Sequence, residues 1–122
     1  MPTYFFDSYA IIEIVKDNPN YKKYAEEIVV ISIFNLAEIY WSALNDLRDD
    51  KAKEIYRKFR ECVVEIDDDT IMEAIKFRKE HKKKDLSYTD CIGYTYALKN
   101  NLLFLTGDKE FESMKNVEFV KK

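Results

Sequence analysis

Short runs of apolar residues recur along the chain and are separated by longer segments with helical periodicity. The five runs are residues 3–6, 28–31, 63–66, 102–105 and 117–120. Three of them, residues 4–6, 28–31 and 102–105, are apolar throughout, which is typical of strands buried on both faces of a parallel sheet. The pattern therefore predicts five short strands.

The segments between the runs place apolar residues at helical spacing. Ser32 and Ser87 are suited to cap helices, and Asn100 with Asn101 is suited to end the second of these. The predicted helices span residues 9–15, 21–27, 33–44, 49–61, 70–80 and 88–99, with one further turn near residues 109–114. Strands that alternate with helices predict the α/β fold class, as a three-layer α/β/α domain with a central five-stranded parallel sheet. Residues 1–122 are expected to form this single domain.

Composition narrows the range of functions. The net charge of −3 argues against a general polycation, so any binding of nucleic acid would need a local patch. No run of about 18 apolar residues occurs, and no basic segment with an apolar stretch opens the chain, so a cytoplasmic protein without membrane contact is expected. Cys62, Cys91 and the single histidine, His81, lack zinc-ligand spacing, and two buried, reduced thiols are expected.

Three aspartates stand where strands or turns meet helices. Asp7 follows the first strand, Asp90 lies three residues after Ser87, and Asp108 follows a Thr-Gly turn after the fourth strand. Taken singly, each is most simply a helix cap or part of a capping box.

Glu38 differs because its neighbours in the predicted helix are nearly all apolar. A buried carboxylate there would be costly without a cation or a hydrogen-bond donor, so a partner is expected. A position on an exposed strip of the helix is the simpler alternative.

Together the four acids suggest a metal site. The α/β geometry can bring them to one crevice outside the carboxyl ends of the strands, where they would repel one another without a cation. An all-oxygen set without His or Cys selects Mg²⁺ or Mn²⁺. Such ions promote phosphoryl transfer by activating a water and neutralising charge on the phosphate.

At these motifs the chain resembles a PIN-domain ribonuclease of the VapC toxin type, over nearly its whole length. The resemblance rests on FFDS with Asp7, NLAEIYW with Glu38, LSYTDCIGYTYA with Asp90 and LLFLTGDKEF with Asp108. Thr106 matches the hydroxyl residue commonly found two positions before the last acid.

The resemblance implies a function and partners. The strand ending at Asp7 would lie beside that ending near Asp108. Asp7, Asp90 and Asp108 would hold Mg²⁺ or Mn²⁺, and Glu38 would orient or deprotonate the attacking water or be a further ligand. The products would carry 5′-phosphate and 3′-hydroxyl ends. The protein would be an endoribonuclease toxin and a homodimer, neutralised by a small antitoxin protein that occupies the acidic crevice.

Other residues have weaker functional interpretations. Ser8, Thr106 and Glu110 could support the acids, although each is as well explained as a turn or cap residue. The basic run Lys82, Lys83 and Lys84 could contact the RNA backbone, although a solvated loop is the simpler explanation. Tyr88, Tyr94 and Tyr96 could stack bases, but at helical spacing most are expected in the core or an interface.

Two other functions remain open from sequence alone. One is a catalytically silent PIN-like module that binds RNA or a protein. The other is a phosphoaspartate protein of similar topology, but a receiver would need paired acids after the first strand and a phosphatase a DxD motif. Only Asp7-Ser8-Tyr9 occurs there, which disfavours this second alternative.

Overall fold

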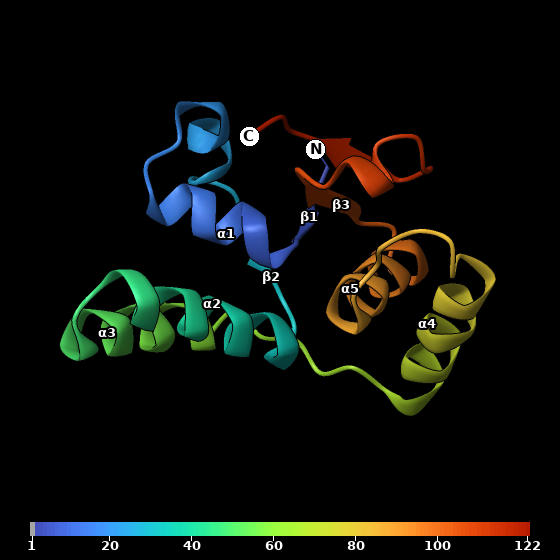
Figure 1. Cartoon of the computed structure of the whole chain (residues 1–122), viewed down its shortest axis with the longest axis horizontal. Helices are drawn as coiled ribbons and strands as arrows, with labels where there is room; N and C mark the ends of the chain where they lie inside the picture. The colour runs from blue at the N-terminus through green and yellow to red at the C-terminus, as the bar shows by residue number, and fades with distance from the viewer. Residues whose placement is uncertain (1) are drawn as a thin grey trace.

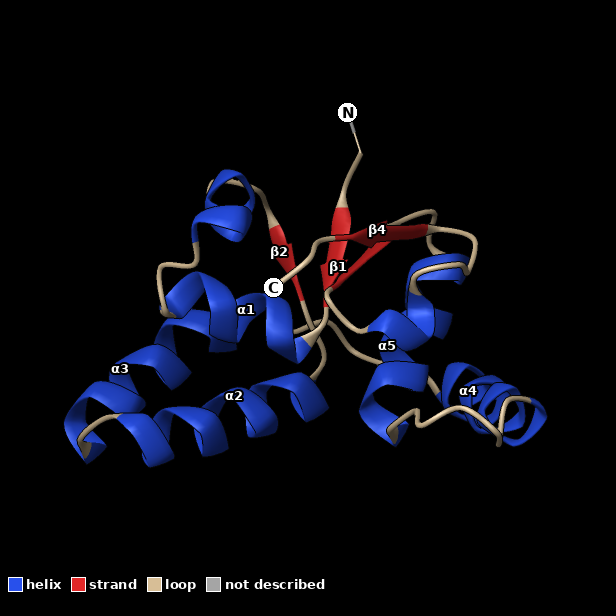
Figure 2. Ribbon diagram, turned by 45° about the horizontal axis from the view of Figure 1, so that its top comes forward, coloured by secondary structure: helices blue, strands red, loops and turns tan. Residues whose placement is uncertain are grey.

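The computed structural model describes residues 2–122, which form a parallel sheet between two groups of helices (Figures 1 and 2). The strands are β1 (Tyr4–Phe6), β2 (Val29–Val30), β3 (Leu103–Thr106) and β4 (Val117–Phe119). The helices are α1 (Ser8–Val15), α2 (Ile33–Asp46), α3 (Asp49–Arg60), α4 (Asp68–Glu80) and α5 (Tyr88–Lys99), with 3₁₀ turns η1 (Pro19–Tyr24) and η2 (Lys109–Phe111). The predicted three-layer α/β/α architecture is confirmed.

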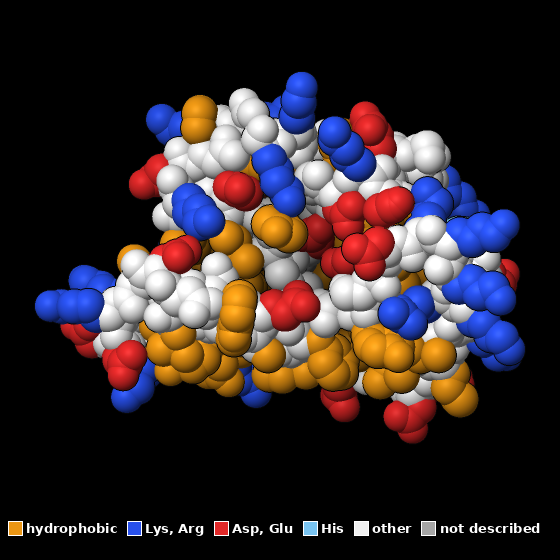
Figure 3. Space-filling view, viewed as in Figure 1, with side chains coloured by type: hydrophobic (Ala, Val, Ile, Leu, Met, Phe, Trp, Pro, Cys, Tyr) orange, Lys and Arg blue, Asp and Glu red, His pale blue; other side chains and the backbone are white. Residues whose placement is uncertain are grey.

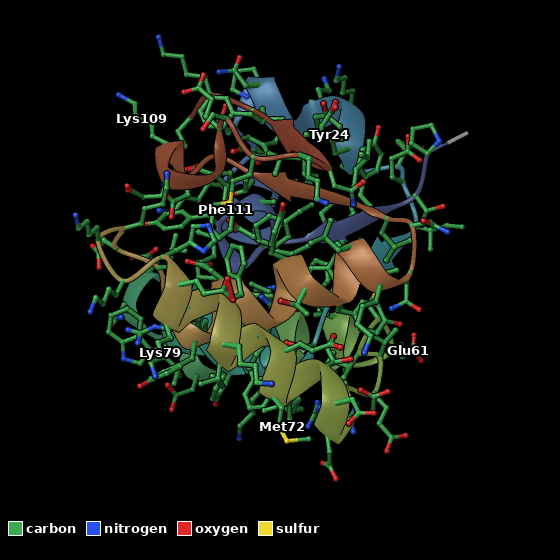
Figure 4. All side chains as sticks on the ribbon, turned by 90° about the vertical axis from the view of Figure 1, so that its right-hand side faces the viewer. Tyr24, Glu61, Met72, Lys79, Lys109 and Phe111 are labelled. Atoms are coloured by element: carbon green, nitrogen blue, oxygen red, sulfur yellow. The ribbon has the colours of Figure 1, made fainter. Side chains whose placement is uncertain are left out.

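Alternation along the strands divides the core in two. Tyr4 and Phe6 face α1, η1, α2 and α3, whereas Phe5 faces α4, α5 and η2. All three side chains are buried, as the apolar run predicted. Figure 2 shows the two helical groups on opposite sides of the strands, and Figure 4 shows Met72 projecting from α4 away from the sheet.

The strand order is β2-β1-β3-β4, with every pair parallel. The chain passes from β1 to β2 on one side and reaches β3 on the other side of β1. The order therefore reverses between β1 and β3, which is where parallel α/β sheets form ligand crevices.

The predicted strand at residues 63–66, the third of the five in chain order, is reduced to a single bridge. Val63 pairs in parallel with Ile31, and the amide of Val64 donates to the carbonyl of Ile31 at 2.8 Å. The chain then turns towards Asp67, which caps α4 by accepting from the amide of Thr70 at 2.8 Å. The run thus adjoins the sheet at its β2 edge, but the cap of α4 follows too closely for a longer ladder.

Smaller differences concern the helices and the thiols. The predicted helix at residues 21–27 is the 3₁₀ turn η1, which Pro19 and the Asn18 cap begin earlier. Asn101 follows α5 with a left-handed φ of 57°, in agreement with the predicted stop. Both cysteines are free, but only Cys91 is fully buried, since Cys62 lies partly exposed after α3.

Candidate active site

Asp7 is a buried carboxylate at the end of β1. Its Oδ1 accepts hydrogen bonds from the amides of Tyr9, at 2.5 Å, and Ala10, at 3.2 Å, so Asp7 caps α1 as its structural explanation predicted. Its Oδ2 accepts from the hydroxyl of Thr106 on the neighbouring strand β3. Only 2% of Asp7 is exposed, so its carboxylate is held by donors from two elements.

Thr106 links the first acid to the last. Its Oγ1 donates to Asp7 and accepts from the amide of Asp108 at 3.0 Å. Asp108 in turn accepts at Oδ1 from the amide of Glu110 at 2.9 Å, which begins η2. β1 and β3 are hydrogen-bonded neighbours, so Asp7 and Asp108 stand at adjacent strand ends.

Asp90 lies in the first turn of α5, where its amide donates to Ser87 Oγ at 3.0 Å. Gly93, one turn later, lets α5 approach the sheet closely. A Cβ at Gly93 would lie 2.6 Å from Cε1 of Phe5. Close packing of α5 against β1 therefore fixes the position of Asp90 beside Asp7.

Glu38 lies on the second turn of α2, and its side chain is exposed. The expectation of a buried Glu38 is wrong, because α2 keeps a solvent-facing strip that also carries Phe34 and Trp41. The expected partner is nevertheless present, since Ser8 Oγ donates to Glu38 Oε1 at 2.5 Å. Ser8 Oγ itself accepts from Asn35 Nδ2 at 3.0 Å.

The four predicted acids line one cleft of about 520 Å³, together with Ser8 and Ser87. This volume lies within the range of about 300–1,000 Å³ typical of ligand sites. Figure 3 shows acidic side chains gathered near the middle of one face of the molecule, with apolar side chains beside them. Residues from β1, α2, α5 and the turn after β3 therefore converge as the sequence predicted.

The cleft raises the proton affinity of two of its carboxyls. Burial, and then the charge of Asp90, raise the pKa of Asp7 to about 7, against the lowering effect of its hydrogen bonds from Thr106, Ala10 and Tyr9. Burial raises the pKa of Asp90 to about 6 against the lowering effect of its hydrogen bonding with Ser87, and the charges of Asp108 and Glu38 add smaller upward contributions. Within residues 2–122, none of the four carboxylates forms a salt bridge.

The donor set fits a hard divalent cation held by few protein ligands. In the described part of the chain, no three or more His, Cys, Asp or Glu side chains have the arrangement to hold a metal ion by themselves. Mg²⁺, however, is usually bound through one or two carboxylates together with waters and substrate phosphates. The open cleft lined by four carboxylates suits this way of binding Mg²⁺, because it leaves room for waters and substrate phosphates around the ion.

The other predicted contacts lie outside the cleft. Lys82, Lys83 and Lys84 occupy the loop between α4 and α5 and do not line the cleft. Lys84 Nζ donates to the carbonyl of Glu110 at 3.1 Å.

The three tyrosines of α5 differ in exposure. Tyr94 is buried, Tyr96 is partly buried against Phe5, and Tyr88 is 59% exposed beneath Arg78. The expectation that most of these tyrosines belong to the core is therefore correct.

Sequence reasoning missed several residues that line the cleft or support its walls. Asn35 is buried and forms a reciprocal capping box with Ser32, a role that the Ser-x-x-Asn spacing could have indicated. Tyr9, Lys16 and Trp41 also line the cleft, which the helical spacing of residues 9–15 and 33–44 does not indicate. Apolar spacing alone does not reveal that a large side chain faces a cleft.

The sequence of residues 4–117 matches the PIN domain family. The chain belongs to the PIN domain family. Proteins of this family are generally nucleases. No curated protein sequence matches this chain.

Solved structures of low sequence identity have the same fold. A toxin–antitoxin complex from Klebsiella pneumoniae is 20% identical, with a TM-score of 0.73 over 95% of this chain and 96% of the other. VapBC2 from Rickettsia felis, bound to a DNA fragment from its promoter, is 15% identical, with a TM-score of 0.72 over 98% and 99%. FitAcB from Neisseria gonorrhoeae is 16% identical, with a TM-score of 0.65 over 88% and 89%.

The helices within residues 2–122 include none with the length and apolar character needed to cross a membrane.

Proposed function

We propose that this protein is a metal-dependent endoribonuclease that hydrolyses RNA phosphodiester bonds, and that it is the toxin of a VapBC-type toxin–antitoxin pair. The observation that carries the proposal is the convergence of Asp7, Glu38, Asp90 and Asp108 on one cleft with no cationic side chain paired to them in residues 2–122. A site that concentrates negative charge in this way is suited to divalent cations and to a reaction at a phosphate.

In this proposal Asp7, Asp90 and Asp108 jointly hold Mg²⁺ or Mn²⁺, one or two of them as direct ligands and the rest through bound waters. The bound ion supplies a more acidic water and neutralises charge that develops on the phosphate. Asp7 keeps its orientation because donors from α1 and β3 use both of its oxygens, while one lone pair on Oδ2 remains for a ligand.

Glu38 is the residue proposed to orient or deprotonate the attacking water. Its Oε1 accepts from Ser8, which leaves Oε2 for the water. Ser8 is in turn held by the buried amide of Asn35, so the carboxylate is positioned from both α1 and α2. In-line attack by that water would leave 5′-phosphate and 3′-hydroxyl ends.

Two protein partners belong to the proposal. The antitoxin is suggested by the toxin–antitoxin complexes that share the fold. A homodimer is supported by exposed apolar side chains on α2 and α4, among them Ile33, Phe34, Met72 and Ile75. Phe34→Lys is expected to shift a wild-type dimer towards monomer in analytical ultracentrifugation, and an unchanged dimer would place the interface elsewhere.

RNA contacts by Lys82, Lys83 and Lys84 remain part of the proposal as a secondary surface. The loop is mostly exposed, and Lys84 anchors it beside η2, next to the turn that carries Asp108. A polyanionic substrate that crosses the cleft could reach this loop from the Asp108 side.

The test is cleavage of a pool of single-stranded and structured RNA with Mg²⁺, Mn²⁺ or EDTA. Wild type and the exposed control Asp85→Asn are expected to cut only with metal, whereas folded Asp7→Asn and Asp108→Asn are expected to cut nothing. Wild type, free of any copurifying antitoxin, that neither cuts RNA nor binds a divalent ion would instead favour the silent RNA- or protein-binding module.

A further inference from the structure

The cleft extends beyond the four acids along α1 and α2. Tyr9, Ile12, Lys16, Trp41 and Ser42 line this extension. Trp41 lies three residues after Glu38 and therefore on the same side of α2, and Tyr9 lies two residues after Asp7. Non-acidic side chains, most of them large, thus continue the wall of the candidate active site.

The two aromatic residues of the extension are more than half exposed to solvent. Trp41 is 69% exposed and Tyr9 is 51% exposed. Exposed large apolar side chains that border a cleft commonly mark a binding site. Exposed aromatic faces beside a phosphate-processing site are suited to stack unpaired bases.

The end of the described chain places a cation against one of these rings. Tyr21 Oη donates to the carbonyl of Val120 at 2.7 Å, and Asn20 Nδ2 donates to that of Lys121 at 3.0 Å. These bonds hold the chain so that Nζ of Lys122 lies 3.2 Å from the centroid of the Tyr9 ring, a cation–π contact. The ammonium group of Lys122 therefore lies beside the wall of the cleft.

Lys16 provides a second positive charge in the same region. It lines the cleft, and its only salt bridge within residues 2–122 is with Asp46, at 3.9 Å between side chains that are 55% and 54% exposed. An exposed pair of this kind is weak and is readily exchanged for another anion. The acidic part of the cleft repels a polyanion, so these two lysines are suited to bind phosphates that flank the reacting one.

We propose that Tyr9, Trp41, Lys16 and Lys122 form a subsite for single-stranded RNA, which extends the endoribonuclease function proposed above. The ring of Trp41 and the face of the Tyr9 ring that Lys122 does not cover stack unpaired bases next to the scissile phosphate, and the two lysines bind the neighbouring phosphates. Paired bases already stack within their own helix, so this subsite selects unpaired segments over duplex.

Binding of a short, fluorescein-labelled, single-stranded RNA of mixed sequence tests the subsite, with Ca²⁺ in place of Mg²⁺ and anisotropy as the signal. Trp41→Ala and Tyr9→Ala are each expected to weaken binding by about 5- to 100-fold, and Trp41→Phe is expected to restore most of it. The matched control is Leu44→Ala, an exposed apolar residue on α2 that does not line the cleft.

The salt dependence of the same binding separates the two chemistries. Lys16→Ala and Lys122→Ala are each expected to reduce the slope of log affinity against log salt by about 0.7, as expected for one lost phosphate contact on a single strand. Trp41→Ala is expected to leave that slope unchanged, because stacking releases no counterion. Lys53→Ala, an exposed lysine on α3 that does not line the cleft, is the control.

Parallel cleavage assays distinguish failure of the subsite from failure of the nuclease. If wild type cuts RNA while Trp41→Ala and Tyr9→Ala bind within about twofold of wild type, the subsite is wrong and the nuclease stands. If binding depends on Trp41 and Tyr9 as expected but wild type cuts nothing with Mg²⁺ or Mn²⁺, the subsite stands and the nuclease is wrong. Equal affinity for duplex and single strand would overturn the proposed preference.

Discussion

Replacing Asp7 with Asn should stabilise the metal-free protein at neutral pH. Burial and the charge of Asp90 raise the pKa of Asp7 from 3.8 to about 7 in the folded state. The folded protein therefore holds this proton up to about pH 7, whereas the unfolded chain releases it near pH 4. Because the unfolded state binds fewer protons in that window, the free energy of unfolding falls as pH rises from about 4 to about 7.

The magnitude follows from the difference between the two pKa values. At about 1.4 kcal/mol per pH unit, a difference of about three pH units destabilises the metal-free protein by about 4 kcal/mol near pH 8. An Asn side chain keeps the acceptor for the Tyr9 and Ala10 amides, but it places an NH₂ group against the Thr106 hydroxyl. That mismatch costs about 1 kcal/mol at every pH, so Asp7→Asn should be about 3 kcal/mol more stable than wild type at about pH 8 and slightly less stable than wild type at about pH 4.

Urea unfolding at several pH values, with EDTA present, measures this difference. The exposed control Asp85→Asn should follow wild type throughout, since its side chain is not buried in the cleft. Added Mg²⁺ should stabilise wild type and not Asp7→Asn. If Asp7→Asn is less stable than wild type at about pH 8 without metal, the carboxylate is not a destabilising charge and the electrostatic account of the cleft is wrong.

Three further outcomes are expected. Ser8→Ala should lower kcat of RNA cleavage by about 10- to 100-fold with a smaller effect on KM, because the Ser8 hydroxyl positions Glu38. Ser8→Thr keeps a hydroxyl and should restore kcat, whereas unchanged kcat in Ser8→Ala would show that Glu38 needs no such support. Gly93→Val should lower the free energy of unfolding in urea by about 1–3 kcal/mol, because a Cβ would lie 2.6 Å from Cε1 of Phe5; unchanged stability would contradict the close packing of α5. Mn²⁺ binding should strengthen from about pH 5 to 8 and should release protons near pH 6, because the metal must displace protons from Asp7 and Asp90. Calorimetry in buffers of different ionisation enthalpy measures both effects, and an affinity independent of pH would mean that these carboxyls are not ligands.

The parts of the fold that the sequence predicted best are those where burial is complete. The run at residues 4–6 becomes β1, and all three of its side chains are buried on alternate faces, so no polar residue could stand among them. The run at residues 63–66 lies at the sheet edge next to a helix cap. Its length depends on where α4 begins, which is a tertiary constraint that hydrophobicity does not encode.

The candidate site was predictable to the level of its acids but not of its walls. Asp7 and Asp108 follow strands, so parallel topology alone brings them to the same edge. Glu38 was placed on the correct helix for a wrong reason, since its side chain is exposed. Trp41 has the spacing of a core residue, and only the packing of α2 shows that it faces the cleft.

Direct titration of the protein with Mn²⁺ in the presence of a single-stranded RNA oligonucleotide tests the central claim most directly, because the substrate phosphate can complete the coordination of the ion. The account predicts that wild type and Asp85→Asn bind Mn²⁺ alike, whereas Asp7→Asn, Asp90→Asn and Asp108→Asn each bind it at least about 10-fold more weakly. Folded wild-type protein that binds no Mn²⁺ even with RNA present, or aspartate variants that bind it as wild type does, would contradict the assignment of the acidic cleft as a metal-dependent nuclease site.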